Sequence, residues 1–154
     1  MTARISDTWA IGLRLAAPAG GARLRGRGCI FAALLGATQA GAETSFPTPS
    51  GQEVTLAEVL LDENPGALWV RFRFVAPDIA REGGATDVDS AMGDLQHLCD
   101  EIAVPYLSQH DISPSRIVIS FSDRFVPFGQ PAADATQYFE LFSPENGACI
   151  WEEF

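Results

Sequence analysis

The chain has 154 residues, a formal net charge of −10 at pH 7 and no lysine. Its length allows one domain of ordinary size. So acidic a protein repels nucleic acid and anionic membrane surfaces, and we predict neither as a partner. The charge is unevenly divided: residues 1–42 hold five arginines and one acid, a net +4, whereas residues 43–154 hold five arginines and 19 acids, a net −14. This division predicts a targeting segment joined to a mature domain.

The basic N-terminal segment has the pattern of a signal peptide. In ARLRGRGCIFAALLGATQAGAETSF, three arginines precede the apolar stretch 29–37, and the A-G-A at 40–42 fits a cleavage site. The apolar stretch is far shorter than the roughly 20 residues that span a bilayer. We therefore predict a signal peptide at 1–42, cleaved to leave a periplasmic protein without a membrane span. The region before Arg23 is unusually long for a signal peptide. A start codon assigned too far upstream, which would place residues 1–22 outside the protein, would explain this length.

The mature chain opens with an extended lead-in at 43–52, rich in Pro, Ser and Gly, and a single α+β domain follows at 53–154. Residues 67–76 alternate between two faces and are bounded by turn residues on both sides, so they predict a strand. Residues 53–62 are ambiguous. They fit the partner strand of a hairpin, which we favour, but TLAE at 55–58 also fits a capping box that opens a short helix.

One amphipathic helix is predicted from Thr86 or Asp87 to about Gln109. Its apolar residues recur at steps of three and four. Aspartates near its start suit the positive end of the helix dipole. Pro105 is expected to kink the helix or end it early.

Three further strands are predicted after the helix. The first is the β-branched run SRIVISFSD at 115–123, followed by the loop RFVPFGQPAAD. TQYFELFSPENGACIWEEF predicts a closing hairpin with its turn at 144–147. The order is β-β-α-β-β-β. We therefore predict an α+β two-layer domain in which one amphipathic helix packs across one face of an antiparallel sheet of about five strands.

The two cysteines outside the leader, Cys99 and Cys149, predict a structural disulfide, because an exported protein matures in an oxidising compartment. The bridge ties the helix to the last strand. It closes a loop of about 50 residues, worth roughly 4 kcal/mol in the chain-entropy view. The alternative is a reactive thiol at Cys99 beside His97, but side chains two residues apart on a helix point to different faces.

Arg71 and Arg73 lie one residue apart in an otherwise apolar strand, in the stretch ALWVRFRFVAP. Because acids are abundant, we expect cross-strand ion pairs on the sheet face away from the helix. A hairpin with a four-residue loop places Glu58 opposite Arg71. The alternative is an anion or carboxylate site built by these arginines and others.

The aromatic loop after the strand at 115–123 is a second candidate surface. Its apolar residues either bind a partner or fold under the sheet edge. One helix covers only one face of a sheet, so apolar residues exposed on the other face mark a binding surface. The candidate ligand- or partner-binding residues are Trp69, Arg71, Arg73, Asp123, Arg124, Phe128 and Trp151.

No catalytic motif is recognisable. The sequence lacks G-x-S-x-G, H-E-x-x-H, C-x-x-C, G-x-G-x-x-G and a P-loop. We therefore predict no catalytic residues, no metal and no cofactor. The leading hypothesis is a periplasmic binding or interaction module that holds a periplasmic protein or a small ligand. The alternatives are a small carboxylate-based hydrolase and a purely structural envelope component.

Three stretches, LLDENPGALWVRFRFVAP, VISFSDRFVPFG and GACIWEEF, resemble a family of short exported alphaproteobacterial proteins of unknown function. The resemblance covers nearly all of residues 50–154. It implies export and a single small domain, and it brings no established activity or catalytic residues with it.

Overall fold

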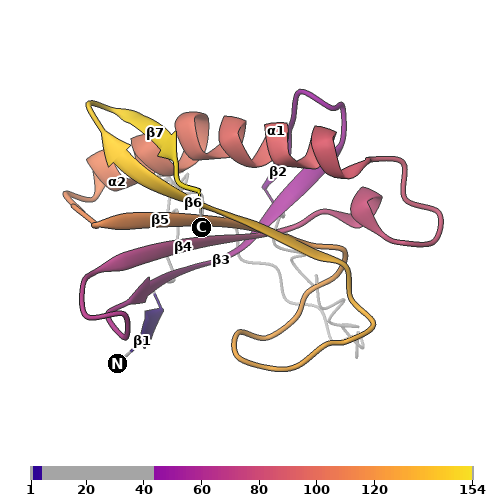
Figure 1. Cartoon of the computed structure of the whole chain (residues 1–154), viewed down its shortest axis with the longest axis horizontal. Coiled ribbons are helices and arrows are strands. Elements are labelled where there is room, and N and C mark those ends of the chain that lie inside the picture. The colour runs from indigo at the N-terminus through magenta and orange to yellow at the C-terminus, as the bar shows by residue number, and fades with distance from the viewer. Residues whose placement is uncertain (1, 5–43, 154) are drawn as a thin grey trace, which may run out of the picture. The chain divides into compact units, whose positions relative to one another are not determined.

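The computed structural model describes residues 2–4 and 44–153. One long helix lies across one face of a twisted sheet (Figure 1). The strands are β1 (Thr2–Arg4), β2 (Ser45–Pro47), β3 (Glu53–Asp62), β4 (Trp69–Val75), β5 (Arg116–Ser122), β6 (Gln137–Glu145) and β7 (Ala148–Trp151). The helix comprises α1 (Val88–Leu98), a π-helical segment (Cys99–Ala103) and α2 (Val104–Gln109), and a short 3₁₀ turn lies at Pro77–Ile79. In the part of the chain that the structure describes, no helix is long and apolar enough to cross a membrane.

The sheet is mixed. Its order is β3-β4-β5-β6-β7, with β1 and β2 both paired to the outer edge of β3. β4 and β5 are parallel, and the other pairs are antiparallel. The predicted α+β class with one helix across one face is confirmed. The purely antiparallel sheet of about five strands is wrong, because residues 44–153 alone supply six strands, β2 to β7.

The error in topology lies in the connection between β4 and β5. Tight turns join antiparallel neighbours, but a chain that returns through a long helix re-enters the sheet from the same end and pairs in parallel. The helix between Val75 and Arg116 is such a crossover. The sixth strand, β2, is only three residues long, too short to show an alternating pattern.

The helix begins as predicted and passes Pro105. Asp87 caps it by accepting a hydrogen bond of 2.9 Å from the backbone N–H of Ser90. Proline has no N–H and crowds the carbonyl of the preceding turn. The π-helical segment Cys99–Ala103 lies directly before Val104 and Pro105. Its wider turn accommodates the proline, so the helix continues to Gln109.

The main core lies between the helix and the sheet. Val70, Phe72 and Phe74 of β4 are buried in it, and the parallel register places Phe72 beside Ile119. The predicted disulfide is confirmed: Cys99 and Cys149 are bonded, with their Cα atoms 6.0 Å apart. It joins the π-helical segment to β7. The core residues are Val54, Val59, Val70, Phe72, Phe74, Ala76, Ile79, Ala91, Leu95, Leu98, Cys99, Ala103, Leu107, Ile117, Ile119, Phe121, Phe142 and Cys149.

Candidate functional site

The sheet face opposite the helix, called here the open face, carries most of the predicted binding residues. Because side chains alternate along a strand, the burial of Val70 and Phe72 against the helix places Trp69, Arg71 and Arg73 on the open face. A loop formed by residues 123–136 connects β5 to β6 and lies on this side of the sheet (Figure 1).

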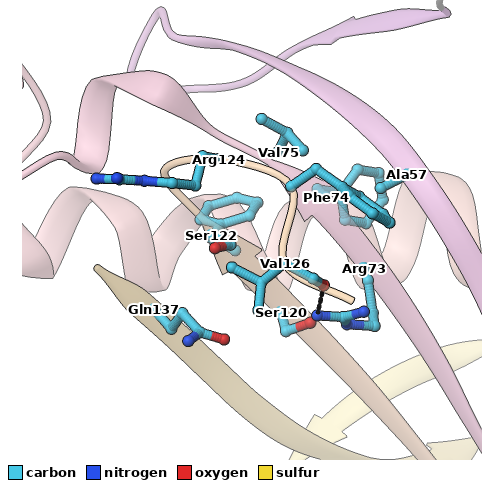
Figure 2. Close-up of a pocket in the computed structure, with 11 residues that line it drawn as sticks. Ala57, Arg73, Phe74, Val75, Ser120, Ser122, Arg124, Val126 and Gln137 are labelled. Atoms are coloured by element: carbon cyan, nitrogen blue, oxygen red, sulfur yellow. Dashed lines mark hydrogen bonds between the residues drawn. The ribbon is translucent and has the colours of Figure 1, made fainter. Parts of the chain in front are cut away.

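Arg73 joins the sheet to this loop. Its guanidinium pairs with the carboxylate of Glu58, and the two side chains are only 14% and 11% exposed. A second guanidinium nitrogen donates a hydrogen bond of 2.8 Å to the backbone oxygen of Val126, the contact drawn in Figure 2. The expected cross-strand ion pair therefore exists, but in a different register: Glu58 lies opposite Arg73, and Arg71 lies opposite Leu60.

The register differs because the connection between the two strands is longer than assumed. The chain leaves β3 at Asp62 and enters β4 at Trp69, so more than four residues separate the strands. The pairing is regular from Asp62 and Trp69 to Glu58 and Arg73. A further shift between Leu56 and Glu58 changes only the pairs beyond Glu58.

Arg71 pairs with a buried acid and lies between two aromatic rings. Its Nε and Nη2 lie 2.9 and 2.8 Å from Asp62 Oδ2. Its guanidinium carbon lies 5.4 Å from the ring centroid of Trp69 and 5.7 Å from that of Phe128, within the range of cation–π attraction. Burial alone would raise the pKa of Asp62, but hydrogen bonds from Asn64 and Arg71 outweigh it and hold the pKa below its usual value.

The Phe128 ring also faces the second arginine, at 5.6 Å from the guanidinium carbon of Arg73. The structure thus brings Trp69, Arg71, Arg73 and Phe128 together in one cluster. In this cluster the arginines pair with acids of the same chain. The geometry therefore favours internal ion pairing over the capture of an external anion.

Asp123 and Arg124 lie at the base of the loop, apart from that cluster. The backbone N–H of Asp123 donates to the Thr136 carbonyl at 3.0 Å, and the Thr136 N–H donates to the Asp123 carboxylate at 3.0 Å. Arg124 Nε donates to the same carboxylate at 2.8 Å. The bond from Arg124, opposed by burial and assisted by Thr136, lowers the pKa of Asp123. These contacts close the two ends of the loop on each other.

The space between the loop and the sheet is too small for a ligand. Figure 2 shows the side chains around it, among them Ser120, Ser122 and Gln137. The enclosed volume is about 10 Å³, which is at most the space of one water molecule. The loop therefore covers part of the open face and leaves no pocket beneath it.

Exposed apolar side chains gather on this side of the molecule. Phe139 and Ile150 lie on the open face, because they alternate with the core residues Phe142 and Cys149. The large apolar residues exposed in the described part of the chain are Val88, Phe125, Phe128, Phe139, Ile150 and Trp151. The sequence pattern did not assign Phe139 and Ile150 to this face, since the closing hairpin holds apolar residues in both alternating positions.

Trp151 lies on the other side of the sheet, away from the arginine cluster. It is two residues from Cys149, which is bonded to the helix, and it pairs with the core residue Phe142. Its indole N–H donates to Glu140 at 2.5 Å. The structure therefore does not bring Trp151 together with Trp69 and Phe128.

Asp94 of α1 is a fully buried carboxylate, which the sequence analysis did not single out. It accepts hydrogen bonds from Thr48 Oγ1 at 2.9 Å, from the Ser50 N–H at 2.9 Å and from Gln52 Nε2 at 2.7 Å. Burial would raise its pKa, but these bonds reverse the effect and lower it. Its position three residues after the buried Ala91 was the available signal.

Two further features of the described residues were candidates for a site, and neither has clear chemistry. Among residues 2–4 and 44–153, no group of three or more His, Cys, Asp and Glu side chains is arranged to hold a metal ion. A groove of about 240 Å³ lies near the end of α2, lined mainly by apolar residues such as Leu107, Ile112 and Pro144. It falls below the roughly 300–1,000 Å³ typical of ligand pockets.

Comparison with known proteins identifies a family and no activity. Neither a curated protein nor a solved structure matches the chain significantly. The family described as "Family of unknown function (DUF6497)" matches residues 30–154, which is most of the chain. The resemblance to proteins of unknown function is thereby confirmed, and the chain belongs to this family.

Proposed function

We propose that the protein is an exported interaction module that binds a partner protein on the open face of the sheet. One observation carries the proposal: Phe125, Phe128, Phe139 and Ile150, four of the six large apolar side chains exposed in the described residues, belong to this face or its loop. Exposed apolar residues that share one surface often mark an interaction site, whereas single scattered ones are common on any protein.

The surface is rigid enough to serve as a binding site. Phe139 lies within β6, directly beside Ser120 of β5. Ile150 lies on β7, two residues before Glu152, which pairs with Arg116 at 2.6 Å. Aromatic residues held on a rigid backbone lose little conformational entropy on binding, and they dominate the energy of protein interfaces.

Charge indicates the kind of partner. Residues 43–154 carry a net charge of −14, so a second copy of the same domain is repelled. A partner whose apolar surface is rimmed by Lys and Arg is attracted, and the attraction speeds association. The space between the loop and this face is too small for a ligand molecule, which favours a protein over a small ligand as the partner.

The proposal includes export to the periplasm. It is supported by the arginines, apolar stretch and A-G-A of residues 1–42 and by the disulfide, which suits an oxidising compartment. Fractionation of cells and N-terminal sequencing test it. A periplasmic protein that begins at Glu43 is expected, and an intact N-terminus in the cytoplasmic fraction would contradict export.

Site-specific photo-crosslinking tests the binding surface. A photoreactive phenylalanine analogue replaces Phe139, which is 60% exposed, or Val88 at the start of the helix, which is 50% exposed. Both positions are equally accessible, but only Phe139 is on the open face. We expect one discrete adduct from position 139 and none from position 88. Equal adducts from both positions would show that exposure alone explains the capture.

A further inference from the structure

The two edges of the sheet, β7 and β3, differ in how well they are protected against pairing with further strands. On β7, Cys149 lies opposite Pro144, which cannot donate a hydrogen bond. The Cys149 carbonyl instead accepts from Gln96 at 3.0 Å, and the Cys149 N–H donates to the Asp100 carboxylate at 2.8 Å. The disulfide to Cys99 holds this edge against the helix. Helix side chains thus cap the β7 edge, as is common for edges that must not pair with other strands.

The β3 edge accepts strands. Its outer side pairs with β2 at Glu53–Thr55 and with β1 at Leu60–Asp62. No strand of the described residues pairs with it at Leu56–Val59. The second occupant, Thr2–Arg4, comes from the distant N-terminus and pairs antiparallel. The edge therefore binds a short extended segment that is not its neighbour in sequence, which is the geometry of strand addition.

The charge of the chain and the proposed cleavage of the leader both affect the outer edge of β3. β3 belongs to residues 43–154, which carry a net charge of −14, whereas residues 1–42, which include β1, have a net charge of +4. The proposed cleavage after Ala42 removes β1 and leaves β2 in place. Removal of the leader would therefore leave the backbone groups at the end of β3 without their strand, on a strongly acidic domain.

We propose that the outer edge of β3 at Leu60–Asp62 is a strand-addition site for an extended basic peptide. In the precursor, Thr2–Arg4 of the same chain fills it. After the leader is removed, a basic segment of a partner takes its place. Main-chain hydrogen bonds supply the binding, and the net negative charge of the domain favours basic side chains. The site is a sheet edge, separate from the open face, so the failure of either proposal leaves the other standing.

Hydrogen exchange of the full-length protein, resolved by residue with NMR, tests the site. Consecutive residues in an antiparallel strand point their N–H groups to opposite sides, so at least one amide of Leu60–Asp62 faces β1. The variant Ala3→Pro/Arg4→Pro removes two consecutive donors from β1. We expect at least about tenfold faster exchange of the outward amide in this variant. Unchanged exchange of the core amides of Phe72 and Ile119 will show that the domain remains folded.

Peptides then refill the vacated edge in trans. The amidated peptide MTARIS, added to the proline variant, is expected to restore the slow exchange at Leu60–Asp62. The peptide MTPPIS, which lacks the two donors, should fail, and MTAEIS should bind at least about tenfold more weakly because its charge is unfavourable. The proposal is overturned if MTARIS restores nothing, or if either control peptide works equally well.

Discussion

Arg73 on β4 donates a hydrogen bond of 2.8 Å to the backbone oxygen of Val126, 53 residues later in the chain. The same guanidinium pairs with Glu58 on β3. One side chain therefore links two strands to the loop that covers part of the open face. The stability of this arrangement, and of the surface beside it, therefore depends on the contacts of the Arg73 guanidinium.

Removal of the Arg73 guanidinium should be costly. Arg73→Met leaves the largely buried Glu58 carboxylate without it, and loss of one member of a buried pair typically costs about 3–5 kcal/mol. Arg116→Met is the matched control, because the Arg116–Glu152 pair is much more exposed and exposed pairs contribute at most about 1 kcal/mol. Urea unfolding of both variants measures the difference. Similar losses in both variants would contradict this assignment.

Phe128 should contribute more to the stability of the fold than Phe125 of the same loop. The Phe128 ring faces the guanidinium groups of Arg71 and Arg73, so Phe128→Ala is expected to lower the free energy of unfolding by about 1–2 kcal/mol. Phe125 is the more exposed ring, so Phe125→Ala should change it by less than about 0.5 kcal/mol. Thermal unfolding of the two variants checks the order, and the reverse order would show that the ring contacts do not hold the loop.

The buried Asp94 carboxylate should make stability dependent on acid pH. Its folded-state pKa is lowered, so its contribution is fully present above the unfolded pKa, near about 3.9. That contribution is lost as the pH falls below about 4. Asp94→Asn replaces one carboxylate oxygen, an acceptor, with an amide NH₂ group that faces the donors of Thr48, Ser50 or Gln52. This substitution should lower the free energy of unfolding by about 2 kcal/mol at pH 7.

The pH dependence separates this effect from general acid unfolding. The difference in unfolding free energy between wild type and Asp94→Asn should shrink between pH 5 and pH 3. Asp89→Asn, an exposed aspartate on the same helix, serves as control and should differ little from wild type at pH 7. A gap between wild type and Asp94→Asn that stays constant with pH would mean that Asp94 is not ionised in the folded protein.

The disulfide should be a main source of stability. Cys99 and Cys149 are 50 residues apart, and release of such a loop costs roughly 4 kcal/mol in the chain-entropy view. For a domain of this size, Cys99→Ser/Cys149→Ser should lower the Tm by roughly 15 °C. Reduced wild type should behave like the double variant in calorimetry. A Tm within a few degrees of that of the oxidised protein would show that the bridge contributes little.

The features that the sequence predicted are those with a strong local pattern. The alternation through Val70 and Phe72 predicted β4 and its two faces, and the steps of three and four predicted the helix with Asp87 near its start. The disulfide followed from the count of cysteines outside the leader. Each of these inferences needed only neighbouring residues or a simple pairing.

The features that the sequence missed depend on residues far apart. The parallel pairing of β4 and β5 depends on the path of the crossover, which no local pattern records. The pairing of Glu58 with Arg73 depends on where the connection between β3 and β4 begins and ends, and the local pattern misplaced those points. The buried site of Asp94 was missed because its donors lie more than 40 residues earlier in the chain. The side of the sheet occupied by Trp151 likewise required the register of β7.

Crosslinking combined with charge substitution tests the open face most directly. The photoreactive analogue replaces Phe128, and the adduct with the partner is measured in cells that also carry Phe139→Glu or Val88→Glu. The account predicts that Phe139→Glu lowers the adduct at least about tenfold, a cost of about 1.4 kcal/mol in binding, whereas Val88→Glu leaves it unchanged. A folded Phe139→Glu variant that still gives the full adduct would contradict the proposal that this face binds the partner.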